Sequence, residues 1–246
     1  MTITTIAFDG DDTLWHHENF FLEAKQRLHA LLNRHGHYPD ALERMDHQHI
    51  IELPVWGYGV KAHILSAIQA AIVMTDGKIP AQAIGEMLTI GRELYQHPLN
   101  LLEGVTETIG KLRDRYQLLL ITKGDLVAQE MKIHKSGLSE FFDGIEIVSE
   151  KDTKTYQKIM RRYGVKPEQF VMVGNTLRSD IAPVIALGAQ AIHIPYQTSW
   201  DFEKAEIAEI DREKFIMLPS IKDVPALLDR LEKSGQDKLS ALVESA

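Results

Sequence analysis

The hydrophobic positions of this 246-residue chain follow two different spacings. Residues 3–8 form a short apolar, β-branched run, which predicts a buried strand ending at a group of acidic residues. From about residue 17 to 100, apolar residues recur every three or four positions, which is typical of amphipathic helices. Breaks between these helices are predicted at 36–39, 54–59, 76–80 and 97–98, and we expect no strand in this region.

After Gly104 the pattern changes to an alternation of strands and helices. Buried strands are predicted at 116–122, 144–149, 170–174, 189–195 and 215–218, and helices at 105–115, 125–135, 153–163, 178–187 and 221–232. Such alternation predicts an α/β fold, a Rossmann-like parallel sheet with helices on both faces. We therefore expect a core built from 1–15 and 104–246, with an all-α domain, 16–103, inserted after the first strand. The tail after Lys233 is expected to fray.

Composition limits the class of protein. Hydrophobic residues make up 44% of the chain and charged residues 25%, as in an ordinary globular protein. The net charge of -8 argues against nucleic acid or a membrane surface as a partner, and the absence of cysteine excludes disulfides and thiolate metal sites. No segment approaches the ~20 apolar residues of a membrane span, and the N-terminus does not resemble a signal peptide. We expect a cytoplasmic protein, and its oligomeric state stays open.

Polar side chains gather where four of the predicted strands end. They are Asp9, Asp11, Asp12 and Thr13 after the first strand, Thr122, Lys123, Gly124 and Asp125 after the second, Lys151 and Lys154 after the third, and Asn175 and Asp180 after the fourth. Each alone could be a polar turn, a helix cap or a surface charge. Because ligands bind at the carboxyl ends of parallel strands, we expect one shared site, with Asp9 and Asp11 approaching from the same side of their strand.

The residue types in this set suit phosphate chemistry. Clustered carboxylates and an amide oxygen favour Mg²⁺, which also offsets their repulsion. The hydroxyl of Thr122 and the backbone N–H groups around Lys123 and Gly124 could hold phosphate oxygens at a helix start. Lys151 would balance the charge of a bound anion. A carboxylate lying against a phosphoryl group can attack it and form an aspartyl-phosphate.

The order of these motifs resembles that of the haloacid dehalogenase-like hydrolase superfamily. DGDDT at 9–13 matches the DxDxT motif, LLLIT at 118–122 the apolar strand ending in Thr or Ser, and GNTLRSD at 174–180 the motif usually written GDxxxxD. The lysine of the third motif is Lys151 or Lys154, and the spacing to Tyr156 favours Lys151. Asn175 departs from the family pattern, in which Asp is common, and Asp12 stands where Gly is frequent. Asp12 could be a further acid beside the metal site, but we favour its interpretation as a structural loop or helix-start residue that bonds backbone N–H groups.

The resemblance implies a Mg²⁺-dependent phosphohydrolase acting on a small phosphorylated metabolite. Asp9 would be the nucleophile and Asp11 the general acid and base. Metal contacts would come from Asp9, the backbone carbonyl of Asp11, Asn175 and Asp180, and substrate contacts from Thr122, Lys123, Gly124 and Lys151. The helical insertion would be the cap typed as C1 in this superfamily, which closes over the site and selects the leaving group.

Alternative functions remain open at this point. A haloacid dehalogenase uses the same nucleophile but needs neither a metal nor the second acid, so Asp11 and Asp180 count against it. Phosphomutases share the phosphatase motifs, and a non-catalytic phospho-acceptor would combine similar residues on a parallel sheet. Within the insertion, Trp56, Tyr58 and Lys61 are candidate contacts to a leaving group, although a turn between helices with buried aromatics is the interpretation we favour. Trp15, His16 and His17, where the chain leaves the core, could line a pocket or serve as a hinge.

Overall fold

The structure is a computed structural model that describes residues 3–198, 200 and 215–234. The tail that was predicted to fray lies, from residue 235 onward, outside the described residues. Two compact units are present, and each is described by itself. The sheet unit comprises the chain up to His16, Leu99–Lys123 and the chain from Glu130 onward. The helical unit comprises His17–Pro98 and Gly124–Gln129.

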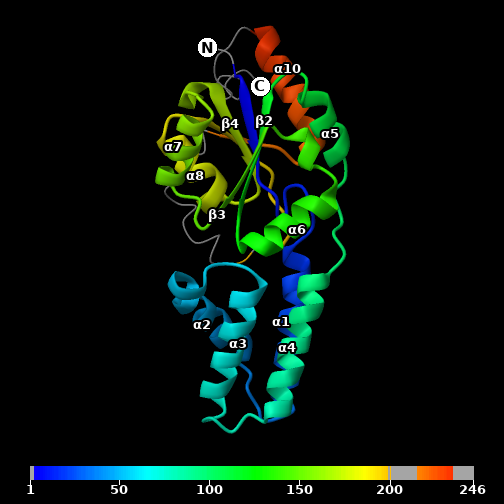
Figure 1. Cartoon of the computed structure of the whole chain (residues 1–246), viewed down its shortest axis with the longest axis vertical. Coiled ribbons are helices and arrows are strands. Elements are labelled where there is room, and N and C mark those ends of the chain that lie inside the picture. The colour runs from blue at the N-terminus through cyan, green and yellow to red at the C-terminus, as the bar shows by residue number, and fades with distance from the viewer. Residues whose placement is uncertain (1–2, 199, 201–214, 235–246) are drawn as a thin grey trace. The chain divides into compact units, whose positions relative to one another are not determined.

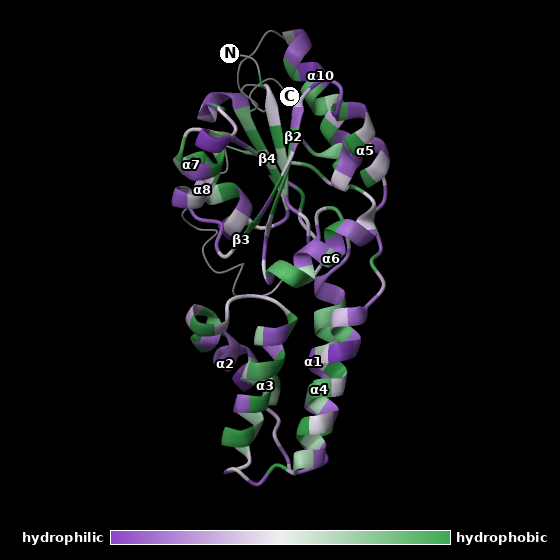
Figure 2. Ribbon diagram, in the orientation of Figure 1, coloured by the Kyte–Doolittle hydropathy of each residue, from purple (hydrophilic) through white to green (hydrophobic). Residues whose placement is uncertain are grey.

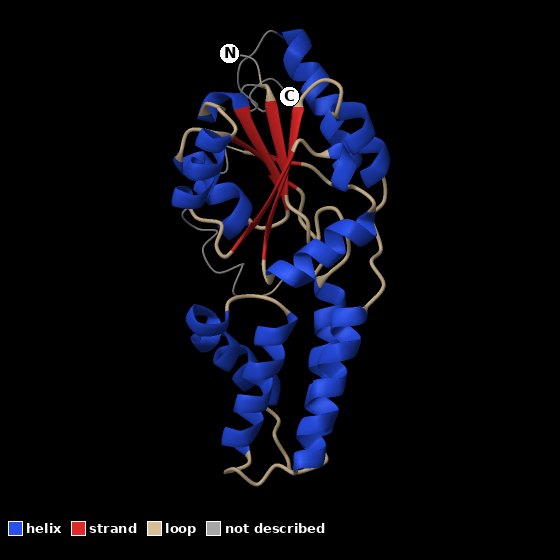
Figure 3. Ribbon diagram, viewed as in Figure 1, coloured by secondary structure: helices blue, strands red, loops and turns tan. Residues whose placement is uncertain are grey.

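The sheet unit is built on one parallel sheet with the strand order β3-β2-β1-β4-β5-β6 (Figure 3). Its strands are β1 (Thr5–Phe8), β2 (Gln117–Lys123), β3 (Gly144–Val148), β4 (Phe170–Gly174), β5 (Gln190–His193) and β6 (Ile216–Met217). Phe8, the last residue of β1, pairs with Leu120 of β2 and with Val173 of β4, so β4 continues one residue and β2 three residues beyond the end of β1. The chain continues to β2 on one side of β1 and later to β4 on the other, which makes this edge a topological switch point.

Alternate residues of the central strand pack into separate cores on the two faces of the sheet. Ile6 and Phe8 join Ile109 in one cluster, while Ala7 joins Ile159 in the other. The helices of this unit are α5 (Val105–Leu112), α6 (Leu126–Ser136, whose first residues belong to the helical unit), α7 (Thr153–Arg162), α8 (Ala182–Ala186) and α10 (Val224–Ser234) (Figure 1). Figure 2 shows the apolar strands between these helices. The predicted α/β Rossmann-like fold is confirmed.

The helical unit contains α1 (Glu18–Asn33), α2 (Ala41–Trp56), α3 (Val60–Met74) and α4 (Ala81–Gln96). Their apolar faces form a core of their own, which includes Leu28, Met45, Ala71 and Met87. Among the described residues, no helix has the length and apolar content needed to cross a bilayer. The unit therefore folds around side chains that its own helices supply.

Some predicted boundaries were wrong. The predicted break at 54–59 falls too early, because α2 continues through Pro54 to Trp56. Pro54 lies in the last turn, where it has no N–H to donate to the carbonyl of Ile50, and Gly57 ends the helix with a φ of 70° and an N–H donated to Leu53. The prediction that the aromatic residues of this turn are buried is wrong for Trp56, which is 53% exposed. The helix predicted at 178–187 is a π-helical turn, Leu177–Ile181, followed by the short α8.

Candidate active site

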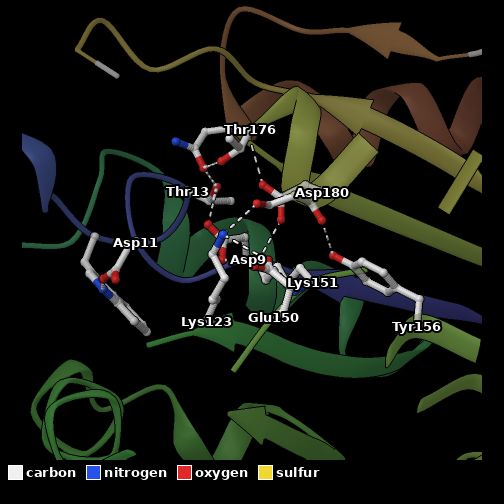
Figure 4. A network of polar contacts seen from close by, with 12 residues as sticks. Asp9, Asp11, Thr13, Lys123, Glu150, Lys151, Tyr156, Thr176 and Asp180 are labelled. Atoms are coloured by element: carbon white, nitrogen blue, oxygen red, sulfur yellow. Dashed lines mark hydrogen bonds and ion pairs between the residues drawn. The ribbon is translucent and has the colours of Figure 1, made fainter. Parts of the chain in front are cut away.

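The site is centred on Asp9, the first residue after β1. Its backbone N–H donates to the carbonyl of Val173 at 2.9 Å, which continues the β1–β4 pairing and fixes the start of the loop. The buried carboxylate of Asp9 accepts a hydrogen bond from the ammonium of Lys151. The same ammonium donates to Asp180 at 2.7 Å (Figure 4). One lysine thus joins two carboxylates delivered by β1 and by the turn after β4.

Lys151 reaches this position because hydrogen bonds to the side chains of its two neighbours in the chain, Glu150 and Asp152, fix the segment after β3. Its own N–H donates to the side chain of Glu150 at 2.9 Å, and Asp152 caps α7 by accepting from the N–H of Thr155 at 2.7 Å. The Lys151 side chain is only 2% exposed. Lys154, the other candidate from the sequence, is exposed. The structure therefore brings Lys151, and not Lys154, to the carboxylates.

Asp180 lies in the π-helical turn and is completely buried. One carboxylate oxygen accepts from Lys151 and the other from the N–H of Thr176 at 3.0 Å, so Asp180 also closes its own turn. Gly174 makes room for it, because a Cβ at that position would lie 2.3 Å from the Asp180 carboxyl carbon. The hydroxyl of Tyr156 donates to the carbonyl of Ser179 at 3.0 Å and supports the turn from α7. Wide π turns of this kind are frequent at functional sites.

The charges of this cluster do not balance. Burial raises the pKa of Asp9 to about 7, the positive charge of Lys151 opposes this shift, and the charge of Asp180 adds to it. Burial also disfavours the charged form of Lys151, but the ion pairs with Asp180 and Asp9 outweigh it and raise the pKa of Lys151 above its ordinary value. Two buried carboxylates thus share one ammonium, and a further cation would offset the remaining negative charge.

The donor atoms next to Asp9 suit a hard cation. Thr13 contacts the Asp9 carboxylate at 3.5 Å and the side-chain oxygen of Asn175 at 3.4 Å, and Thr176 donates to that same oxygen at 3.2 Å. Within the described ranges, no three His, Cys, Asp or Glu side chains converge as a metal centre. A cation here would therefore need the amide oxygen of Asn175 beside the carboxylates of Asp9 and Asp180. Oxygen donors of this type fit Mg²⁺.

Asp11 occupies a different environment from the one that strand alternation predicted. Its carboxylate accepts two hydrogen bonds from Lys132, at 2.7 and 2.8 Å, and one from the indole of Trp15 at 2.6 Å. Figure 4 shows it apart from the network of Asp9 and Lys151. The strand pattern ends at Gly10, whose carbonyl accepts the N–H of Leu14 at 2.8 Å, and the loop turns back on itself. Asp11 therefore has partners of its own, although its negative charge still reaches Asp9 and adds to the rise in the pKa of that carboxyl.

Sequence reasoning missed Lys132, which lies on α6 well after the second motif. The sequence of α6 contains a second lysine, Lys135, which is exposed, and nothing in the residue pattern indicates which of the two faces the site. Asp12, in contrast, behaves as predicted for a loop residue: it has a positive φ of 60° and donates its N–H to the Trp15 carbonyl at 2.7 Å. That left-handed backbone is one that glycine adopts without steric cost.

The end of β2 contributes a hydroxyl and a second ammonium. Thr122 is fully buried, and its hydroxyl oxygen lies 3.2 Å from where a Cβ on Gly10 would be. Lys123 donates to Ser179 at 2.9 Å and to Glu150 at 3.3 Å, and Figure 4 shows it beside Asp9. Lys123 therefore belongs to the same cluster and Thr122 lies next to the loop at Gly10, whereas Gly124, which follows in the chain, belongs to the helical unit.

Other sequence candidates have structural partners. Asp125 caps α6, as one interpretation of the sequence had it, by accepting from the N–H of Ala128 at 3.0 Å. Lys61 pairs with Asp125 at 2.8 Å inside the helical unit. Trp15 is fully buried in the core of the sheet unit. The ring of His16 contacts the hydroxyl of Tyr196 at 2.6 Å.

Fold and site together define an α/β protein with a lysine-bridged acidic centre at the carboxyl edge of its parallel sheet. The model of the haloacid dehalogenase-like hydrolase family matches residues 3–188, and the chain belongs to this family. A solved family hydrolase from Xanthomonas campestris is 37% identical, with a TM-score of 0.83, and the match covers 95% of this chain and 93% of that one. The expected family and fold are thus confirmed.

Curated relatives of the chain are phosphatases by name. The chain is 32% identical over 148 residues to the glyceraldehyde 3-phosphate phosphatase of Pyrococcus furiosus. This matched segment covers 57% of this chain and 58% of that protein. It is 25% identical over 244 residues to the pyrophosphatase PpaX of Bacillus cereus. That match covers 95% of this chain and 100% of that protein. The likeness to the archaeal enzyme thus spans little more than half of each chain.

Proposed function

We propose that this protein is a Mg²⁺-dependent phosphohydrolase that cleaves a small phosphomonoester through an aspartyl-phosphate on Asp9. The observation behind the proposal is the buried Lys151 ammonium, which joins Asp9 to Asp180 at the carboxyl edge of the sheet. The named phosphatases among the relatives support it. Mg²⁺ held by Asp9, Asn175, Asp180 and the backbone carbonyl of Asp11 would neutralise charge on the phosphoryl oxygens.

In the first half of the proposed reaction, a carboxylate oxygen of Asp9 attacks phosphorus and the ester P–O bond breaks. Asp11 gives a proton to the leaving oxygen. Water then attacks phosphorus, Asp11 takes its proton, and inorganic phosphate and the Asp9 carboxylate are released. Lys151 and the Thr122 hydroxyl would hold the phosphoryl oxygens, which is where charge stabilisation contributes most. Lys123 and the N–H of Gly124 would add substrate contacts.

The helical unit would act as the cap that excludes water and selects the leaving group. Because the Asp9 cluster would supply the chemistry, the helical unit would select the substrate. A panel of phosphorylated metabolites, assayed with and without Mg²⁺, identifies that substrate. Phosphosugar isomers in the same panel would reveal a phosphomutase by isomer formation without phosphate release.

The test uses p-nitrophenyl phosphate as the substrate. We expect hydrolysis that requires Mg²⁺ and is abolished in Asp9→Asn, because an amide cannot displace the ester oxygen. Metal-independent turnover, or an active Asp9→Asn protein shown by mass to be free of deamidation, would contradict the proposal. Halide release from chloropropionate would indicate a dehalogenase, and a stable phosphoprotein without turnover would indicate a phospho-acceptor.

A further inference from the structure

The Asp11 carboxylate is held by two side chains from different parts of the sheet unit. Lys132 donates to both carboxylate oxygens, at 2.7 and 2.8 Å, and Trp15 donates to one of them at 2.6 Å. The Lys132 and Asp11 side chains are 18% and 19% exposed, so solvent screens this pair less than an ordinary surface ion pair. Charge-assisted bonds to both oxygens restrict rotation of the carboxylate as well as its position.

Both donors are themselves fixed. Trp15 is fully buried, and its ring lies so close to Gly10 that a Cβ there would be 2.6 Å from it. Its carbonyl accepts the N–H of Asp12 at 2.7 Å, which closes the loop back onto Asp11. Lys132 projects from α6, whose start is capped by Asp125. The carboxylate is thus held between a rigid loop and a helix that follows the β2 strand end.

We propose that Lys132 is a positioning residue for Asp11, with Trp15 as its partner. This inference rests on the proposed function, in which Asp11 moves a proton to and from the reacting oxygens. An acid or base is effective only when it lies within hydrogen-bond reach of the atom it serves. Lys132 holds the Asp11 carboxylate in one orientation, and its positive charge offsets the repulsion between that carboxylate and those of Asp9 and Asp180. Lys132 does not touch the reacting atoms.

The experiment compares two substrates that differ in their need for a proton. p-Nitrophenolate leaves readily without one, whereas the alkoxide of a primary alkyl phosphate does not. For Lys132→Met we expect kcat on the alkyl phosphate to fall about 100-fold and kcat on p-nitrophenyl phosphate to fall less than about 10-fold, with KM little changed. Lys132→Arg should restore most of the lost rate, because a guanidinium also donates to both oxygens. Lys135→Met, on the exposed side of the same helix, is the matched control and should keep both rates.

Trp15→Phe keeps an aromatic ring and removes the indole donor, so we expect the same selective loss, but a smaller one. An equal loss on both substrates in Lys132→Met, or no loss, overturns the inference. Thermal unfolding gives a reading independent of catalysis: the falls in Tm caused by Lys132→Met and by Asp11→Asn should not add in the double variant. Additive falls overturn the pairing itself. A wild-type protein inactive on both substrates overturns the proposed function and, with it, the positioning role of Lys132.

Discussion

The ammonium of Lys151 donates to the carboxylate of Asp180 at 2.7 Å, and the two side chains are 2% and 0% exposed. Breaking such a pair leaves an uncompensated charge in the interior. We expect Lys151→Met to lower the free energy of unfolding by about 3–5 kcal/mol and to abolish phosphatase activity. Urea unfolding followed by circular dichroism measures the first effect. The control is Lys154→Met, at an exposed position, and a comparable loss in that variant would contradict the assignment of Lys151.

Gly174 and Asp180 share a space that does not admit a methyl group. A Cβ on Gly174 would lie 2.3 Å from the Asp180 carboxyl carbon, so Gly174→Ala must displace Asp180 from Lys151. We expect a loss of about 1–3 kcal/mol in stability and of most of the activity. Gly110→Ala is the matched control, because it lies inside α5 with open space around it and should gain about 0.5–1 kcal/mol. Full activity of Gly174→Ala would show that the position of Asp180 is not essential.

Asn175 presents one oxygen where the family commonly has a carboxylate. Asn175→Asp would add a negative charge beside Asp9 and Asp180, so we expect tighter Mg²⁺ binding and lower stability of the metal-free protein. The Mg²⁺ concentration for half-maximal activity should fall at least about threefold. Asn100 is exposed and has no part in the proposed metal site, so Asn100→Asp makes the same chemical change and should leave that concentration unchanged. An unchanged Mg²⁺ requirement in Asn175→Asp would exclude this side chain from the metal site.

Asp12 adopts a left-handed backbone conformation, with a φ of 60°. Glycine takes this conformation without steric cost, whereas alanine has neither that freedom nor a polar side chain for local hydrogen bonds. We therefore expect Asp12→Gly to keep its activity and its stability within about 1 kcal/mol, and Asp12→Ala to lose about 1 kcal/mol or more. Equilibrium unfolding and the p-nitrophenyl phosphate assay check both. A large loss of activity in a stable Asp12→Gly protein would give Asp12 a role in the chemistry.

The parallel sheet could be predicted because buried strands and amphipathic helices differ in hydrophobic period. Once the strands are parallel, their carboxyl ends share an edge, and this alone places Asp9, Lys151 and Asp180 near one another. The contact between Lys132 and Asp11 depends instead on how the Gly10 loop turns back and on the angle at which α6 leaves the sheet. Neither has a signature in residue spacing. The π-helical turn around Asp180 was missed for the same reason, because its apolar positions also fit an ordinary helix.

His63, inside the helical unit, predicts how stability depends on pH. Burial lowers its pKa to about 3, with smaller contributions from the charges of His49 and Lys25, whereas the unfolded value is near 6.5. The folded state therefore favours the neutral ring, and its stabilising contribution is complete above pH 6.5 and declines as the pH falls below that value. At about pH 4 we expect a loss of roughly 3 kcal/mol relative to neutral pH.

Urea unfolding of the metal-free protein between neutral pH and about pH 4 measures this loss. The centre of the His63 ring lies 5.3 Å from that of Phe21 and 5.6 Å from that of His49. His63→Leu therefore keeps an apolar contact while removing the titrating group. That variant should lose most of the acid-induced decline. His35 is exposed, and His35→Leu should keep the decline of the wild type. A His63→Leu protein that is as acid-sensitive as the wild type would show that other groups cause the decline. Asp9 is not one of them, because its raised pKa makes the folded state more stable, not less, as the pH falls.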